Sequence, residues 1–219
     1  MNKVKKIYNS AKTKEAILNA AEELFAEHGY SATRVDAIAS MSGYNKSLIY
    51  QYFKDKLGLY INVIKRADQL GNTIFNAAAH DLLTDESVTS DPAKFMRLLE
   101  ESVRISYQFL LDHPRYLKIF LWESAEEWKI LKSISYSPDD ISMFYDLAKA
   151  AKENGIIRQD LDAIMFPVIM MNMVIPFLQS YRRMSDMIND KSQWNMSEEA
   201  YLSQIIKFVI YGIMEHSLL

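Results

Sequence analysis

Several common features are missing from this sequence. Its 219 residues include no cysteine, which excludes disulfide bonds and thiolate metal sites. Its apolar runs stay short of the roughly 18 residues that cross a membrane, and the richest, residues 164–178, is broken by Pro167, Asn172 and Pro176. The lysine-rich start is not followed by the apolar segment and cleavage site of a secretory signal. We therefore expect a soluble, cytoplasmic protein.

Patterns that carry catalysis or bind metals are also missing. The four histidines, at positions 28, 80, 113 and 216, are widely scattered and form no His-x-x-x-His pair. The sequence contains neither a glycine-rich phosphate loop nor a nucleophile motif. These absences predict that the chain is not an enzyme and uses no metal or cofactor.

Strand-like alternation is nearly absent, whereas helical periodicity runs through the whole chain. The first helix is expected from Thr13, and Gly29 is expected to end it as a cap. Its apolar residues recur at the spacing of one helix face: Ile17, Ala20, Ala21, Leu24 and Phe25. The chain is therefore predicted to be all-α.

Two short helices around a glycine turn are predicted for residues 33–56. Thr33 opens the first, Gly43 supplies the turn, and Asn45 is a favourable N-cap for the second. Ile49 and Phe53 form the inward side of the second helix. This arrangement is typical of a helix-turn-helix unit, whose second helix enters the major groove of DNA.

The outward side of this second helix carries groups suited to DNA. Lys46 can reach a phosphate or a guanine edge, Gln51 can pair bidentately with adenine, and Tyr50 can donate to a phosphate oxygen. The apolar side chain of Leu48 can contact a thymine methyl group. The predicted DNA contacts are Thr33, Arg34, Asn45, Lys46, Ser47, Leu48, Tyr50, Gln51, Tyr52 and Lys56.

The charge distribution favours the same interpretation. Residues 1–56 hold nine Lys/Arg and six Asp/Glu, a balance of +3, whereas the remaining residues hold sixteen and twenty-two, a balance of −6. Two alternatives stay open at this point. The asymmetry can arise by chance, and helical hairpins with a glycine turn also occur in protein-interaction domains without a DNA role.

The stretch from Ile38 to Lys56, with its ending Tyr-x-Tyr-Phe-Lys-x-Lys, resembles the N-terminal domain of TetR-family transcriptional repressors. The preceding segment from Ala20 to Val35 resembles it as well, and the close match covers about residues 13–65. The resemblance implies an N-terminal three-helix helix-turn-helix DNA-binding domain, residues 1–57. It also implies a C-terminal helical ligand-binding and dimerisation domain, residues 58–219.

The chain departs from the family pattern at five positions. The family often has a small residue at Tyr44, Gly at Ser47 and Thr at Leu48. An acidic residue is common at Leu57, and Gly58 is unusual. These departures leave the operator sequence open without changing the expected fold.

The resemblance implies a homodimer, and wide apolar stripes near the C-terminus support it. Two-fold symmetry then predicts a palindromic operator. The alternative is that both stripes face the core of their own chain. The predicted interface residues are Ile175, Leu178, Leu202, Ile206, Val209, Ile210 and Ile213.

The resemblance also implies a small-molecule inducer, and the aromatic, Met-rich C-terminal region suits a lipophilic or aromatic one. The predicted pocket residues are Tyr107, Gln108, Trp122, Phe144, Asn172, Phe177 and Gln179. Each can instead be an ordinary core or surface residue. We expect a repressor that such a ligand releases from its operator, although an activator is not excluded by the sequence.

Overall fold

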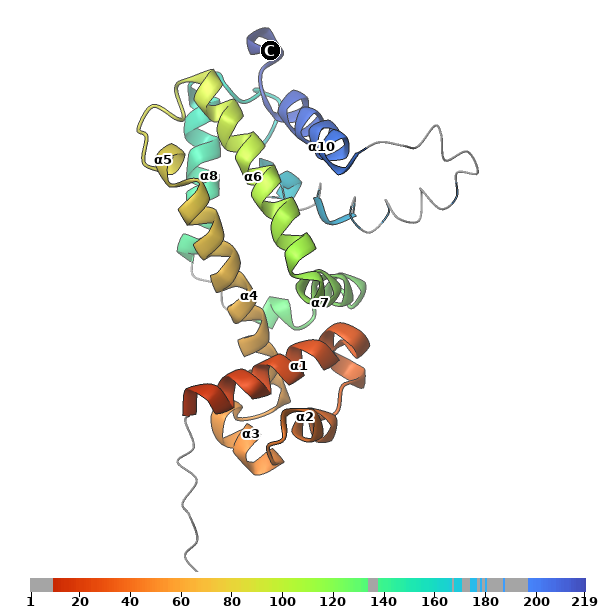
Figure 1. Ribbon diagram of the computed structural model, residues 1–219. Coiled ribbons are helices and arrows are strands. Elements are labelled where there is room, and N and C mark those ends of the chain that lie inside the picture. Colours follow the sequence, from red (N-terminus) through yellow and green to blue (C-terminus); the bar gives the residue numbers. More distant parts are fainter. Residues whose placement is uncertain are drawn as a thin grey trace, which may run out of the picture. The chain divides into compact units, whose positions relative to one another are not determined.

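The computed structural model describes residues 10–133, 138–166, 168–170, 174–176, 178, 180, 187 and 197–219. In these ranges the regular structure is helical, apart from an isolated antiparallel bridge between Ile157 and Met214 (Figure 1). The all-α prediction is confirmed. The chain divides into two compact units: unit 1 is Met1–Leu70 with His113–Ser135, and unit 2 is Gly71–Asp112 with Tyr136–Leu219.

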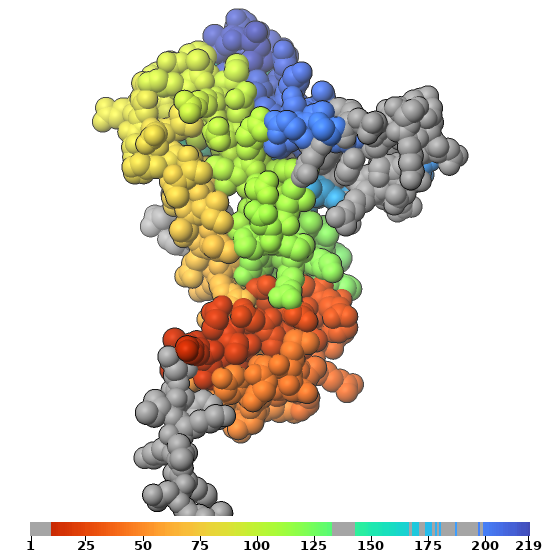
Figure 2. All heavy atoms as spheres, in the orientation of Figure 1, coloured from red at the N-terminus to blue at the C-terminus, as the bar shows by residue number. Residues whose placement is uncertain are grey.

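Unit 1 is built around a long first helix that lies across two short ones (Figure 1). Its elements are α1 (Ser10–Ala32), α2 (Val35–Ser42), α3 (Lys46–Phe53), the first part of α4 (Lys56–Ala78), α7 (Pro114–Ala125) and the 3-10 helix η1 (Leu131–Ser133). Figure 2 shows α1 in red and α2 and α3 in orange as closely packed neighbours. The helix-turn-helix pair expected at residues 33–56 is therefore present as α2 and α3.

The ends of these helices follow the local sequence. Gly43 ends α2 with φ 74° and ψ 15°, a left-handed conformation that glycine adopts without steric cost. The Asn45 side chain accepts a hydrogen bond of 2.9 Å from the Leu48 N–H and caps α3. Gly29 has the non-helical values φ 71° and ψ 175°, so the first helical run stops there as expected, and a short helical stretch follows the kink up to Ala32.

The predicted apolar faces pack together into the core of unit 1. Each large aliphatic or aromatic side chain that is buried there contributes roughly 1.5–3 kcal/mol to folding. The buried members are Ile17, Ala20, Ala21, Leu24, Phe25, Ala26, Val35, Ile38, Ile49, Phe53, Leu59, Tyr60, Val63, Ile64 and Ile119. The inward positions predicted for α1 and α3 are thereby confirmed.

Unit 2 contains the remaining described helices. They are the end of α4, α5 (His80–Leu83), α6 (Pro92–Asp112), α8 (Pro138–Glu153), α10 (Glu198–Ile213) and the 3-10 helix η2 (His216–Leu218). Pro92 opens α6, where its missing N–H costs no hydrogen bond. Helix α10 packs against α6, and both contribute to a large apolar core that includes Phe95, Leu99, Val209 and Ile213.

Unit 1 extends beyond the expected DNA-binding domain of residues 1–57, because it also includes residues up to Leu70 and the segment His113–Ser135. Leu59, Tyr60, Val63 and Ile64 of α4 lie in the core of unit 1, and so does Ile119 of α7. The apolar face of α4 is thus shared with the helix-turn-helix segment. Among the described residues, no helix is both long enough and apolar enough to span a membrane.

Candidate nucleic-acid interface

Helix α3 presents a polar face on a well-anchored backbone. Ile49 is fully buried and Phe53 is 5 % exposed, so both hold the helix in the core of unit 1. Ser47, Tyr50 and Gln51 lie on the exposed side. An amide, a phenol and a hydroxyl on one exposed helix face can donate to and accept from base edges and phosphate oxygens.

A tight turn follows α3 and fixes where α4 begins. Lys54 has φ 70° and ψ −55°, and the Asp55 N–H donates to the Phe53 carbonyl oxygen at 2.8 Å, which together define a γ-turn. The Asp55 carboxylate then accepts a 2.7 Å hydrogen bond from the Gly58 N–H. A Cβ atom at position 58 would lie 2.1 Å from the Phe53 carbonyl oxygen. The unusual glycine at this position therefore makes room for the turn.

Two of the predicted DNA-contacting lysines have partners within the protein. The Lys46 ammonium lies 2.6 Å from an Asp36 carboxylate oxygen, and this hydrogen bond raises the pKa of Lys46. The Lys56 ammonium donates to the Ser31 carbonyl at 3.3 Å and lies 4.4 Å from the Tyr30 ring centroid. Burial lowers the pKa of Lys56. Lys56 therefore ties the start of α4 to the end of α1.

The structure corrects the assignment of Thr33 as a DNA contact. Its side chain is buried, and the hydroxyl lies 2.7 Å from the Gly29 carbonyl oxygen and 3.0 Å from that of Leu24. The hydroxyl thus satisfies carbonyls near the end of α1 and does not face solvent. The side-chain amide oxygen of Asn45 accepts the hydrogen bond that caps α3, but the residue itself is exposed.

The remaining predicted contacts differ in exposure. Arg34 is exposed beside the start of α2, while Leu48 and Tyr52 on α3 are half-buried. The Lys14 ammonium, which the sequence did not single out, lies 5.3 Å from the Tyr52 ring centroid. Lys54 is also exposed at the end of α3. Lys14 was overlooked because its place beside α3 depends on the packing of α1.

A network of ion pairs binds α4 and α7 to α1. The Arg66 guanidinium contacts Glu15 at 3.0 Å and also pairs with Glu22. Arg115 pairs with Glu23 at 2.5 Å. Burial and a hydrogen bond to Glu22 raise the pKa of Tyr116 on α7 to about 12. One face of α1 is thereby linked to two helices that lie far along the chain.

A second polar link lies deeper. The Glu123 carboxylate on α7 is 2 % exposed, accepts a 2.8 Å hydrogen bond from the Tyr60 hydroxyl, and accepts another of 3.1 Å from the Leu131 N–H. Burial raises the pKa of Tyr60. The Trp122 indole N–H donates to the Ala26 carbonyl at 3.3 Å. Helix α7 is therefore an integral part of the unit that carries the helix-turn-helix.

The helix-turn-helix segment matches a known family. The family described as "Bacterial regulatory proteins, tetR family" matches residues 17–63. The chain is 27 % identical over 181 residues to the HTH-type transcriptional repressor BepR of Brucella suis biovar 1, covering 78 % of this chain and 81 % of that protein. The chain is a TetR-family regulator. As such it is a DNA-binding transcriptional regulator.

Other similar proteins extend over nearly the whole regulator. It is 23 % identical over 202 residues to the HTH-type transcriptional regulator RutR of Escherichia coli K12, covering 92 % of this chain and 89 % of RutR. A TetR-family regulator from Marinobacter aquaeolei VT8 has a similar fold, with a TM-score of 0.66 at 16 % identity over 94 % of this chain and 97 % of that one. A regulator from Saccharomonospora viridis, solved in complex with choline, gives a TM-score of 0.62 at 17 % identity, covering 94 % and 100 %.

The apolar stripe predicted as the dimer interface lies largely inside unit 2. The prediction rested on a stripe that can also face its own core, and the structure places it there. Ile175, Leu202, Ile206, Val209, Ile210 and Ile213 are buried, and Leu178 is half-buried against the same core. These side chains therefore pack within the regulator's own chain.

The predicted pocket residues are divided between the units. Tyr107 is buried in the core of unit 2, and Phe144 packs against the same core. Trp122 is corrected, because it belongs to unit 1 and covers Gly29. Gln108 is exposed and donates to Asp112 at 3.0 Å. The predicted residues Asn172, Phe177 and Gln179 lie outside the described residues.

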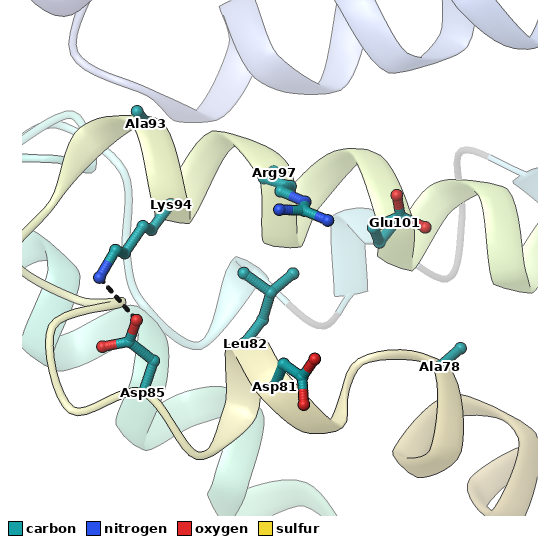
Figure 3. Close-up of a pocket in the computed structure, with 8 residues that line it drawn as sticks. All are labelled: Ala78, Asp81, Leu82, Asp85, Ala93, Lys94, Arg97 and Glu101. Atoms are coloured by element: carbon teal, nitrogen blue, oxygen red, sulfur yellow. Dashed lines mark hydrogen bonds and ion pairs between the residues drawn. The ribbon is translucent and has the colours of Figure 1, made fainter.

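A pocket of about 520 Å³ opens in unit 2 beside α5 and α6, and Figure 3 shows Lys94 directed at Asp85 within it. Its lining contains none of the predicted pocket residues and is largely charged: Ala78, Asp81, Leu82, Asp85, Ala93, Lys94, Arg97 and Glu101. The 2.6 Å ion pair with Lys94, with hydrogen bonds from Ser87, lowers the pKa of Asp85. In the described residues, no group of three or more His, Cys, Asp or Glu side chains can hold a metal ion.

Proposed function

We propose that the regulator is a repressor that reads a palindromic operator through α3 and is released by a small lipophilic or aromatic ligand. The observation that carries the DNA-reading part is the exposed face of α3, where Ser47, Tyr50 and Gln51 stand on a helix that is capped and anchored in a core. Repression is supported by BepR and by NicS of Pseudomonas putida, which are named transcriptional repressors.

The outer face of α10 supports the homodimer. Phe208 is 65 % exposed and Tyr211 is 57 % exposed, one helical turn apart. Gly212 is exposed beside them, and a Cβ atom there would meet nothing within 4 Å. Large aromatic side chains gathered on one exposed helix face are typical of protein interfaces. A second copy of the chain that covers this face would produce the two-fold symmetry that a palindromic operator requires.

Ligand-controlled release is supported by the composition of unit 2. Phe75 and Phe144 lie with their ring centroids 5.4 Å apart, and Tyr107 is buried in the core against which Phe144 packs. A lipophilic or aromatic ligand would be accommodated by rearrangement of such side chains. It would release DNA only if it binds the state with low operator affinity more tightly, and a few kcal/mol of difference shifts most of the population.

DNA reading and release are tested together by selecting bound sites from random duplexes. The proposal predicts enrichment of a two-fold symmetric sequence, repression of a reporter placed behind that sequence, and lower operator affinity with at least one lipophilic compound that binds the protein. Activation of the reporter would contradict repression. Compounds that fill unit 2 without changing operator affinity would contradict release. Absence of any sequence preference at low salt would favour a helical interaction domain.

The dimer surface is tested by Phe208→Ser, with Met143→Ser as control, since Met143 on α8 is another large exposed apolar side chain of unit 2. Sedimentation should show a monomer for Phe208→Ser and a dimer for Met143→Ser and the wild type. The monomer should keep its helical circular dichroism but bind the full operator at least about tenfold more weakly, because it loses linkage of the two half-sites. A Phe208→Ser dimer would exclude this face.

A further inference from the structure

An ion pair joins α2 and α3 at their exposed surface. The Lys46 ammonium lies 2.6 Å from a carboxylate oxygen of Asp36, and the two side chains are 45 % and 72 % exposed. Asp36 lies in the first turn of α2, and Lys46 is the first residue of α3. Lys46 and Tyr50 stand four residues apart and therefore on the same side of α3. The pair thus adjoins the face that is proposed to read DNA.

Lys46 occupies the part of α3 that comes closest to the bases in helix-turn-helix proteins. In such units the N-terminal residues of the second helix contact base edges, while the first helix crosses the DNA backbone. A lysine there can donate to the O6 and N7 atoms of guanine or to a phosphate oxygen. Lys46 is also the single charged residue of α3, all of which the structure describes. The target of Lys46 therefore decides whether the charge of this helix adds sequence preference or only affinity.

The Asp36 carboxylate favours the guanine edge over the phosphate. An ammonium group has three N–H donors, and the contact with Asp36 engages one of them, so two stay available for guanine. A phosphate that approaches Lys46 also approaches the Asp36 carboxylate, and the repulsion between the two anions opposes that contact. The guanine edge carries no net charge, so the same carboxylate opposes it far less. Asp36 therefore restrains the flexible stem of Lys46 and disfavours its phosphate-bound orientation.

We propose that Asp36 is a positioning residue for base reading, which holds the Lys46 ammonium towards the edge of one guanine and away from the phosphate backbone. Lys46 then contributes sequence preference without sequence-independent affinity. This inference rests on the proposed reading of DNA by α3. Without the Asp36 carboxylate, the ammonium is free to bind a phosphate, so the protein would bind all duplexes more tightly and distinguish them less well.

The test compares the wild type with Asp36→Asn, Lys46→Gln and the double variant, by selection of bound sites and by affinity against salt. Asp36→Asn should steepen the slope of log affinity against log salt by about 0.9, the contribution of one phosphate contact. It should also weaken the preference for guanine at one base pair in each half-site. Lys46→Gln should abolish that preference, which is expected to be roughly 5- to 140-fold, and leave the slope unchanged. The double variant should return to the wild-type slope, because the steeper slope of Asp36→Asn depends on Lys46.

Glu27→Gln is the matched control, because Glu27 is another carboxylate of unit 1, is 64 % exposed, and lies 3.8 Å from His28. The substitution removes the same charge from α1, so the slope and the base preferences should match those of the wild type. Helical circular dichroism and urea unfolding check that each variant is folded.

The outcomes separate this inference from the proposed function. An unchanged slope for Asp36→Asn, an equal change in Glu27→Gln, or a slope that falls by about 0.9 in Lys46→Gln alone overturns the inference, while a sequence-preferring wild type keeps the proposed function. Asp36→Asn can instead lose preference at a base pair that Lys46→Gln still reads. Asp36 would then contact a base itself, since a carboxylate accepts from the cytosine amino group, and the positioning role would be wrong. A wild type without sequence preference overturns both.

Discussion

The contacts inside unit 1 differ in kind from the contacts inside unit 2. Unit 1 has a compact apolar core, and polar links such as Arg66–Glu15 and Tyr60–Glu123 also join its helices. The described core of unit 2 is a larger apolar cluster built around residues such as Phe95 and Ile213. Polar links need defined geometry, whereas apolar packing tolerates rearrangement when volume is kept. Unit 1 is thus suited to holding α3 rigid, and unit 2 to adapting to a ligand.

Under the proposed release mechanism, this contrast indicates which part of the protein a ligand would have to move. Helix α7 contributes Trp122 and Glu123 to contacts with α1 and α4, although almost a hundred residues separate α7 from α1. We infer that α7 stays with the helix-turn-helix during release. The part that would move on ligand binding is then unit 1 as a whole and not the first 57 residues alone.

The largest effect on stability is expected in unit 2, from Phe95→Ala. Phe95 is fully buried, and removing its ring leaves a cavity that costs about 3–5 kcal/mol. Urea unfolding followed by circular dichroism should shift strongly. In a Trp194→Phe background, fluorescence reports unit 1, because Trp122 and Trp128 both belong to it. The fluorescence midpoint should shift less than the circular dichroism midpoint, and equal shifts would argue against separate units.

A smaller loss of about 2–3 kcal/mol is expected in unit 1 from Gly29→Ala, since φ 71° with ψ 175° is accessible almost only to glycine. The new Cβ would also lie 3.0 Å from the Trp122 ring. Gly43→Ala is the matched control, because φ is 74° but nothing lies within 4 Å. The control should lose only about 1–2 kcal/mol. Equal losses in urea unfolding would contradict the extra cost expected at Gly29 from its backbone conformation and from the Trp122 ring.

The buried hydrogen bond from Tyr60 to Glu123 is expected to contribute less again. Tyr60→Phe leaves a buried carboxylate oxygen without that donor, at a cost of about 1–3 kcal/mol. A double-mutant cycle with Glu123→Gln measures the coupling by urea unfolding. Glu126→Gln, an exposed substitution on the residue that follows α7, serves as control and should change stability little. Additive effects of Tyr60→Phe and Glu123→Gln would show that this link does not bind α7 to α4.

The smallest effect is expected from Arg115→Gln. Arg115 and Glu23 are 46 % and 45 % exposed, and exposed ion pairs contribute about 0.2–1 kcal/mol. The loss of stability should shrink as salt rises, because salt screens the ion pair and so lowers its contribution in the wild type. Thermal unfolding at low and high salt measures the loss of stability and its dependence on salt. A loss above about 2 kcal/mol that is independent of salt would indicate that Arg115 acts through packing instead of charge.

Local patterns predicted the helix-turn-helix well. The apolar spacing of α3, the turn at Gly43 and the cap at Asn45 depend on residues close together in the sequence. The role of Thr33 was missed because its hydroxyl donates to the Gly29 carbonyl oxygen, a contact that depends on the interruption of α1 at Gly29. The sequence does not reveal why position 58 is glycine. The γ-turn brings the Phe53 carbonyl oxygen to 2.1 Å from the place that a Cβ atom at position 58 would occupy.

Contacts between distant segments were the harder part. Nothing near Trp122 in the sequence indicates that its ring covers Gly29. On α10 the regular apolar stripe marked the deepest face, which packs in the chain's own core. The exposed Phe208 and Tyr211 lie outside that stripe. Periodicity identifies the most buried side of a helix, but it does not separate a core from an interface when both sides carry apolar residues.

The central claim, that the exposed face of α3 reads DNA, is tested most directly by selecting bound sites for the wild type and for Gln51→Ala. A single bidentate contact is worth about 1–3 kcal/mol of discrimination. The variant should therefore lose preference at one base pair in each half-site and keep the others, with an unchanged salt slope. Identical site preferences for the two proteins, or a uniform loss at every position, would contradict base reading by Gln51.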